Sequence, residues 1–267
     1  MAAVTQSMVG HDVVIEGRNL RKTYGTVTAL DGVDVKIRAG EICAIVGDNG
    51  AGKTTLIKIL AGAIQPDAGE TLVLGRRVTL RSPLDARDLG IETVFQDLAL
   101  LPTGDVVTNL FLNREICHGG AFSMFKVMNQ RAMRRLAAER LSSLGVNIPK
   151  LTGIPIARMS GGQRQAVAVG RAAFWATRAI FMDEPTAALG VRESTRVLRL
   201  ARSIADQGLA VVLISHILPH VMEYADRVIV MRHGLKVAEL TEDISTEQLV
   251  RLIVGIDTED VEAPRLD

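Results

Sequence analysis

A glycine-rich run from Gly47 to Thr54 constrains the fold of this chain more than any other feature. It satisfies the pattern G-x-x-x-x-G-K-[ST], in which Lys53 and Thr54 are the last two residues. An apolar stretch (41–46) precedes it and favours a buried strand, and a stretch with helical spacing (55–62) follows it and closes with a glycine. A strand, a glycine-rich loop and a helix in this order form a phosphate cradle, because backbone N–H groups and the helix N-terminus face the anion.

The run and the residue after it are expected to contact a bound nucleotide. Lys53 would reach the β- and γ-phosphates and take part in catalysis, and the Thr54 hydroxyl would bind Mg²⁺. The nine residues of this predicted contact are Gly47, Asp48, Asn49, Gly50, Ala51, Gly52, Lys53, Thr54 and Thr55.

A second motif, Ile180–Glu184, is an apolar run that ends in two carboxylates. Such a run is common and often marks only a strand that leaves the core. Downstream of a phosphate cradle, the functional interpretation is favoured: the strand lies beside the cradle strand and directs Asp183 toward Mg²⁺. Glu184 then lies where it can polarise an attacking water.

Composition narrows the class of protein. The chain has 267 residues, of which 48% are hydrophobic, which is ample for a packed core. The net charge of +1 and the aromatic content of 3% argue against a broad nucleic-acid surface. The two cysteines, Cys43 and Cys117, form no C-x-x-C pair and suit a reducing cytosol. We find no signal peptide and no apolar run near the ~18 residues of a membrane helix, so any membrane role would be peripheral.

The N-terminal third favours β structure. Residues 13–37 predict a small antiparallel sheet, with turns at Tyr24-Gly25 and Asp31-Gly32. Further strands are expected on both sides of Gly75 and at 91–95.

The rest of the chain predicts helices and then a return to α/β alternation. A mainly helical insertion is expected over roughly 97–170, and its helix 129–144 carries Arg131, Arg134, Arg135 and Arg140 on what is most simply a solvated face. Beyond it we expect strands at 179–182, 209–214, 228–231 and 236–239 and helices at 192–206 and 217–224. The predicted fold is an α/β P-loop NTPase with a mainly parallel core sheet, forming one domain over 12–256. Residues 1–11 are expected to be loose, and 257–267 to be a disordered acidic tail.

The stretch Met159–Gln165 (MSGGQRQ) is the motif that most clearly indicates which protein family the chain resembles. Ser160 suits the N-cap of a helix, and two glycines after it leave N–H groups free for an anion. Alone, this would be an ordinary turn before a helix. Between the phosphate cradle and the Asp-Glu strand, it resembles the signature motif of ATP-binding cassette (ABC) ATPases.

This resemblance implies roles for further residues. Tyr24 matches the aromatic residue that stacks on adenine, Gln96 the glutamine that senses Mg²⁺ and links to a transmembrane partner, and His216 the switch histidine at the γ-phosphate. Each residue also has a simpler interpretation. Tyr24 could be a hairpin tyrosine, Gln96 a polar residue at a strand end, and His216 a capping or core histidine. By the same resemblance, two copies of the chain sandwich two ATP molecules, and each copy contributes its signature residues to the other's ATP: Ser160, Gly161, Gly162 and Gln163.

The resemblance covers essentially residues 13–240, with two departures. Met159 replaces the usual leucine of the signature, and Gly190 stands where most members carry an aspartate. The run 184–191 (EPTAALGV) nevertheless resembles that of bacterial monosaccharide importers of the ribose and fructose type, in the single-cassette form, and the segments 90–96 and 164–169 favour the same group.

The resemblance therefore implies an ATPase subunit that converts ATP and water to ADP and phosphate to power sugar import. Its partners would be a second copy, a transmembrane permease and, indirectly, a periplasmic sugar-binding protein, with no nucleic acid. It would lie on the cytoplasmic face of the inner membrane as a peripheral subunit. Two alternatives stay open: an ABC ATPase for a different cargo, and a soluble ABC ATPase that acts outside transport, on DNA or ribosomes.

Overall fold

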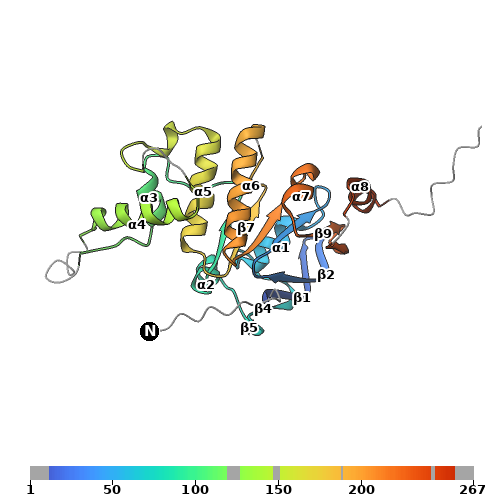
Figure 1. Cartoon of the computed structure of the whole chain (residues 1–267). Helices are drawn as coiled ribbons and strands as arrows, with labels where there is room; N and C mark the ends of the chain where they lie inside the picture. The colour runs from blue at the N-terminus through green and yellow to red at the C-terminus, as the bar shows by residue number, and fades with distance from the viewer. Residues whose placement is uncertain (1–11, 119–126, 147–150, 188, 242–243, 256–267) are drawn as a thin grey trace, which may run out of the picture.

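The computed structural model describes residues 12–118, 127–146, 151–187, 189–241 and 244–255. They form two sheets with helices around them (Figure 1). The first sheet holds β1 (Val13–Tyr24), β2 (Val27–Arg38), β4 (Ala68–Val73) and β5 (Arg76–Val78). The second holds β3 (Ile42–Val46), β6 (Ile91–Val94), β7 (Ala179–Asp183), β8 (Ala210–Ile214), β9 (Arg227–Arg232) and β10 (Leu235–Leu240).

The first sheet is antiparallel throughout, as the sequence predicts, and its strand order is β2-β1-β4-β5. The predicted turn at Tyr24-Gly25 joins β1 to β2, and Gly25 takes a positive φ of 59° there. The predicted turn at Asp31-Gly32 is wrong, because β2 runs straight through it. Leu20 pairs with Val33 and the next residue of β1 pairs with Asp31, so Gly32 is the extra residue of a β-bulge.

The second sheet has the order β10-β9-β3-β8-β7-β6 and is parallel except for β10 at one edge. Its central strands are buried on both sides, which explains why they are almost continuous apolar runs. In β7, Ile180 and Met182 pack in the cluster formed with α5 and α6, while Phe181 packs on the opposite face with α1 and the first sheet. The predicted mainly parallel core is therefore confirmed.

Eight α-helices are described. They are α1 (Lys53–Leu60), α2 (Pro83–Asp88), α3 (Val106–Phe111), α4 (Gln130–Ser143), α5 (Gly161–Trp175), α6 (Val191–Asp206), α7 (Leu218–Tyr224) and α8 (Thr246–Val254), with a 3₁₀ turn at Ile156–Arg158. Helices α2 and α8 had not been predicted from the sequence. Both carry local start signals, because the side chains of Ser82 and Ser245 accept hydrogen bonds from backbone N–H groups of the first turn.

Helices α3 and α4 pack against α5 at one end of the molecule, and we call these three helices the helical lobe (Figure 1). The rings of Phe111, Phe174 and Trp175 pack edge to face, with centroids 4.9–5.7 Å apart. Because α5 continues to Trp175 and packs against β6 and β7, it joins the lobe to the core sheet. Arg140 departs from the predicted solvated face, since its guanidinium donates to the Phe174 carbonyl at 2.7 Å and lies over that ring.

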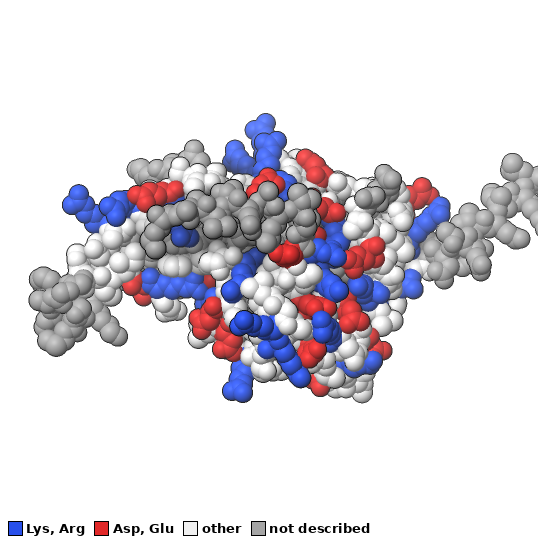
Figure 2. All heavy atoms as spheres, turned by 60° about the horizontal axis from the view of Figure 1, so that its bottom comes forward, with Lys and Arg blue, Asp and Glu red and all other residues white. Residues whose placement is uncertain are grey.

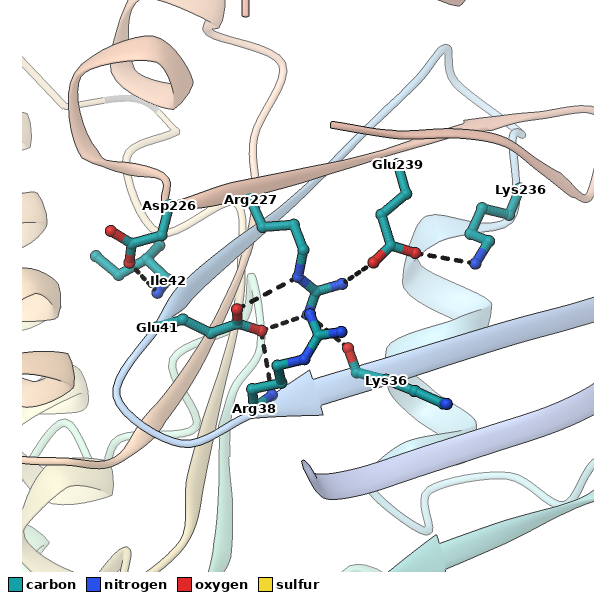
Figure 3. A network of polar contacts seen from close by, with 8 residues as sticks. All are labelled: Lys36, Arg38, Glu41, Ile42, Asp226, Arg227, Lys236 and Glu239. Atoms are coloured by element: carbon teal, nitrogen blue, oxygen red, sulfur yellow. Dashed lines mark hydrogen bonds and ion pairs between the residues drawn. The ribbon is translucent and has the colours of Figure 1, made fainter. Parts of the chain in front are cut away.

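A buried arginine ties the ends of four strands together (Figure 3). Arg227, at the start of β9, is 1% exposed and donates two hydrogen bonds to the Glu41 carboxylate. It also donates to Glu239 of β10 at 2.8 Å and to the Lys36 carbonyl of β2. Burial lowers the pKa of Arg227, but the hydrogen bond and charge of Glu41 more than offset it, so the pKa lies above its usual value and the group stays charged. This network connects β2 of the first sheet to β9 and β10 of the second sheet, which is the core sheet.

Across the part of the chain that the structure describes, no helix is both long enough and apolar enough to cross a membrane. The predicted loose segment 1–11 and the predicted acidic tail 257–267 lie outside the described residues.

Candidate functional site

The glycine-rich run connects β3 to α1 and leaves no room for side chains at two of its glycines. Gly47 has a φ of 146° and Gly52 a φ of 99°, both in the region that favours glycine. A Cβ atom at Gly47 would collide with the Met231 carbonyl oxygen, and one at Gly52 with the Ala29 carbonyl oxygen. The loop is therefore held in one shape by the backbone of its neighbours, with the first turn of α1 beginning at Lys53.

Lys53 points back over this loop. Its side chain is largely buried, and its ammonium donates to the carbonyls of Gly47 and Asp48 at 2.7 and 2.8 Å. Burial lowers the pKa of Lys53, while the nearby carboxylates of Glu184, Asp48 and Asp183 oppose that shift. A cation that is already desolvated and centred in the loop is well placed to contact an anion there.

The Thr54 hydroxyl and the Asp183 carboxylate meet at the carboxyl end of the sheet. Thr54 Oγ1 lies 3.4 Å from Asp183 Oδ1, although the two residues are 129 positions apart. Burial raises the pKa of Asp183, the Thr54 hydroxyl opposes the rise and the Glu184 charge adds to it. A cation between these oxygens would stabilise the charged form of the buried Asp183 carboxylate.

This pair of oxygens fits Mg²⁺, which binds one or two protein oxygens and completes its shell with phosphates and water. Among the described residues, no group of three or more His, Cys, Asp or Glu side chains is arranged as a metal cage. Such a cage is not needed for Mg²⁺ that is shared with a nucleotide.

Glu184 and His216 face one another beside this pair. Glu184 follows β7 in a left-handed conformation, with a φ of 50°, and its N–H donates to the Ile214 carbonyl of β8 at 3.1 Å. His216 lies two residues after β8, and its Nδ1 is 3.4 Å from Glu184 Oε1. Because β7 and β8 are neighbouring parallel strands, the carboxylate and the imidazole leave the sheet at the same edge.

Gln96 and Tyr24 are both exposed. Gln96 is exposed two residues after β6, whose Val94 is in register with Met182, so it leaves the sheet at the same edge as Asp183. Tyr24 is 48% exposed at the β1–β2 turn, with the Lys22 ammonium 5.7 Å from its ring centre. Within the described residues, neither side chain hydrogen-bonds to the glycine-rich loop, and their roles stay predictions.

The signature residues begin α5, as predicted. Ser160 Oγ accepts from the Gln163 N–H at 3.2 Å, and the Gln163 side chain accepts from the Ser160 N–H at 2.9 Å. This capping box leaves the Ser160 hydroxyl proton free to donate outward. The residues from Ser160 to Gln163 lie on the helical lobe, and in the described chain none of them hydrogen-bonds to Lys53 or Thr54. Within the described chain, the signature and the glycine-rich loop are therefore two distinct polar segments that do not hydrogen-bond to each other.

Two features of the site had not been predicted. Glu193 of α6 packs against the signature, where a Cβ atom at Gly162 would collide with its side chain. Helix α8 lies beside the glycine-rich loop, and with the loop and His216 it lines a cavity of about 200 Å³. The amphipathic run 246–254, between Ser245 and Gly255, is the sequence signal that would have revealed this helix.

A family model for the ABC transporter matches residues 30–187. The chain belongs to the ABC transporter family. Two of its relatives match over nearly their whole length. It is 43% identical to the fructose import ATP-binding protein FrcA of Rhizobium meliloti, over 92% of this chain and 96% of that protein. It is 42% identical to the xylose/arabinose import ATP-binding protein XylG of Sulfolobus acidocaldarius, over 91% and 98%.

Solved structures give the same assignment. A nucleotide-free ATP-binding cassette from an ABC transporter superposes with a TM-score of 0.77 at 26% identity, over 94% of this chain and 98% of that one. The dimeric ATP-binding cassette MJ0796, bound to ADP and phosphate, superposes with a TM-score of 0.71 at 26% identity, over 85% and 98%. As an ABC cassette, the chain carries the family's ATP-binding domain, and the family implies a cassette dimer within a transporter complex.

Proposed function

We propose that this ABC cassette is the ATP-hydrolysing subunit of a monosaccharide importer. The ATPase proposal rests on one observation: two pairs of side chains are in contact at the same edge of the core sheet. These pairs are Thr54 with Asp183 and Glu184 with His216. The cargo proposal rests on FrcA and XylG, whose names give fructose and xylose/arabinose import. We further propose that residues 12–256 form a single cassette domain, into which the helical segment 97–170 is inserted.

In the proposed reaction, Lys53 and the loop N–H groups hold the β- and γ-phosphates of ATP. Thr54, Asp183 and Gln96 would hold Mg²⁺, which neutralises charge on the phosphates. Glu184 orients a water toward the γ-phosphate and accepts its proton. His216, 3.4 Å from that carboxylate, would contact the γ-phosphate and keep Glu184 in place. Tyr24 would stack on the adenine.

The second half of each site would come from another copy of the chain. Ser160 has a free hydroxyl proton at the N-terminus of a fifteen-residue helix, which is a suitable donor to a γ-phosphate. Gly161, Gly162 and Gln163 would add backbone and side-chain donors. Closing two copies over two ATP molecules would exclude water and complete the charge-stabilising site.

We also propose the partners and location that follow from this role. A permease would contact the cassette near Gln96, a periplasmic sugar-binding protein would act through that permease, and the cassette would lie at the cytoplasmic face of the membrane. We propose no nucleic-acid partner. On the face drawn in Figure 2, basic and acidic side chains are interspersed, with no continuous basic field.

The ATPase proposal is tested with the substitution Glu184→Gln in the purified protein. Loss of a general base lowers a rate by about 10²–10⁴-fold, so steady-state hydrolysis should fall by that factor while ATP binding is retained. Glu139→Gln, at an exposed carboxylate of α4, is the matched control and should hydrolyse ATP normally. Full activity of Glu184→Gln would refute the role given to this residue.

A further inference from the structure

Asp67 holds the end of β1 that carries Tyr24. It stands directly before β4, and its carboxylate accepts hydrogen bonds from the Lys22 ammonium and from the Thr23 N–H, both at 2.7 Å. Its own N–H donates to the Arg21 carbonyl at 2.8 Å. One aspartate therefore binds three consecutive residues of β1, and Tyr24 is the next residue along the chain.

Lys22 connects Asp67 to the Tyr24 ring. Side chains two positions apart lie on the same face of a strand, and the Lys22 ammonium lies over the Tyr24 ring, 5.7 Å from its centre. The hydrogen bonds from Lys22 and from the Thr23 N–H lower the pKa of Asp67, so this carboxylate is charged at neutral pH. In the part of the chain that the structure describes, Lys22 is the only charged group in contact with the tyrosine ring.

The segment that ends at Asp67 comes from the glycine-rich loop. The loop leads into α1, and residues 61–66 connect α1 to Asp67. Just beyond, β4 lies tightly against β1, because a Cβ atom at Gly69, which has a φ of 92°, would collide with the carbonyl oxygens of Arg18 and Asn19. Asp67 thus joins the chain segment that would hold phosphates to the strand whose tyrosine would hold adenine.

We propose that Asp67 is a positioning residue that orients Tyr24 for stacking on the adenine. The inference rests on the proposed function, in which Tyr24 contacts the base and the glycine-rich loop contacts the phosphates. Asp67 orders the Thr23 backbone and the Lys22 ammonium before nucleotide binds, and the base then stacks on the ring face that Lys22 leaves uncovered. Ordering a flexible side chain on binding lowers affinity by about two- to tenfold, and the contacts of Asp67 avoid this loss.

The test compares a ligand that contains adenine with one that lacks it. Calorimetric titrations use ADP and inorganic pyrophosphate, both with Mg²⁺, and because ADP lacks the γ-phosphate, neither hydrolysis nor the ATP sandwich contributes. Asp67→Ala should lower ADP affinity by about two- to tenfold and leave pyrophosphate affinity unchanged. Asp34→Ala is the matched control, since Asp34 is exposed on β2 and also accepts from a backbone N–H of β1, that of Asn19, at 2.8 Å. It should bind both ligands like the parent.

A double variant makes the test specific for Tyr24. Tyr24→Ala should lower ADP affinity, and Asp67→Ala added to it should cause little further loss, because no ring is left to position. Equal losses for ADP and pyrophosphate in Asp67→Ala, no loss of ADP affinity, or full additivity in the double variant would overturn the positioning role alone. ADP affinity unchanged by Tyr24→Ala would instead overturn the stacking proposed for Tyr24, and the inference with it.

Discussion

Replacing Arg227 with methionine should destabilise the protein strongly, because it leaves a buried carboxylate without its cation. Arg227 is 1% exposed and Glu41 is 4% exposed. After the substitution, Glu41 would keep only the Arg38 N–H, at 3.1 Å, among the partners it has in this network. Removing one member of a buried pair costs about 3–5 kcal/mol. For a chain of this size, that corresponds to a fall in Tm of about 6–20 °C.

The same reasoning predicts that the double variant Arg227→Met with Glu41→Leu is more stable than the single one. Both charges are then gone, and apolar replacement of a buried pair is often close to neutral. Denaturant unfolding, followed by the fluorescence of the single tryptophan, Trp175, measures each free energy. Arg251→Ala breaks the exposed pair with Glu247 and should change stability by less than about 1 kcal/mol. A loss below about 1 kcal/mol in Arg227→Met, or no recovery in the double variant, would refute the argument.

Three further predictions concern the nucleotide site. Lys53→Ala removes charged hydrogen bonds worth about 1.5–3 kcal/mol, so ATP affinity should fall by roughly 10–100-fold in a fluorescence titration; unchanged affinity would contradict the role of Lys53. Gly52→Ala forces a Cβ into the Ala29 carbonyl at positive φ, and should abolish ATP binding and lower the free energy of unfolding by more than about 1 kcal/mol; normal binding would show that the loop can relax. Burial raises the pKa of Asp183, so the folded nucleotide-free protein binds that proton more tightly than the unfolded chain. The charge of Asp183 therefore destabilises the fold at neutral pH, and this effect begins to shrink as pH falls through the raised pKa and is gone below the ordinary pKa of aspartate. Asp183→Asn should accordingly raise the Tm at neutral pH and remove the extra stabilisation that Mg²⁺ gives with ATP; a lower Tm would contradict the sign.

Local patterns were sufficient to predict much of this fold. The strands β3, β7 and β8 are continuous apolar runs with polar or glycine boundaries, and the capping box at Ser160 lies within four residues. Since neighbouring parallel strands end at the same edge, these patterns also place Asp183, Glu184 and His216 together. The turn that was wrongly predicted at Asp31-Gly32 shows the limit of local patterns. An Asp-Gly pair fits both a bulge within a strand and a turn between strands, so the local sequence does not distinguish them.

The features that were missed depend on contacts between distant residues. Arg227 and Glu41 are 186 positions apart, and a lone arginine at the start of a strand does not indicate a buried partner. The same holds for Glu193 on Gly162 and for α8 beside His216, where only the folded chain brings the segments together. Local sequence could have revealed that α8 exists, but not that it borders the nucleotide site.

Uptake of labelled sugar by cells tests whether this cassette powers monosaccharide import. Cells that lack this gene, and the same cells carrying either the natural gene or its Glu184→Gln form, would be compared for uptake of fructose, ribose and xylose. Deletion should abolish uptake of one such monosaccharide. The natural gene should restore it, and Glu184→Gln should not, although equal amounts of both proteins are made. Monosaccharide uptake that is unchanged by deletion would contradict the claim.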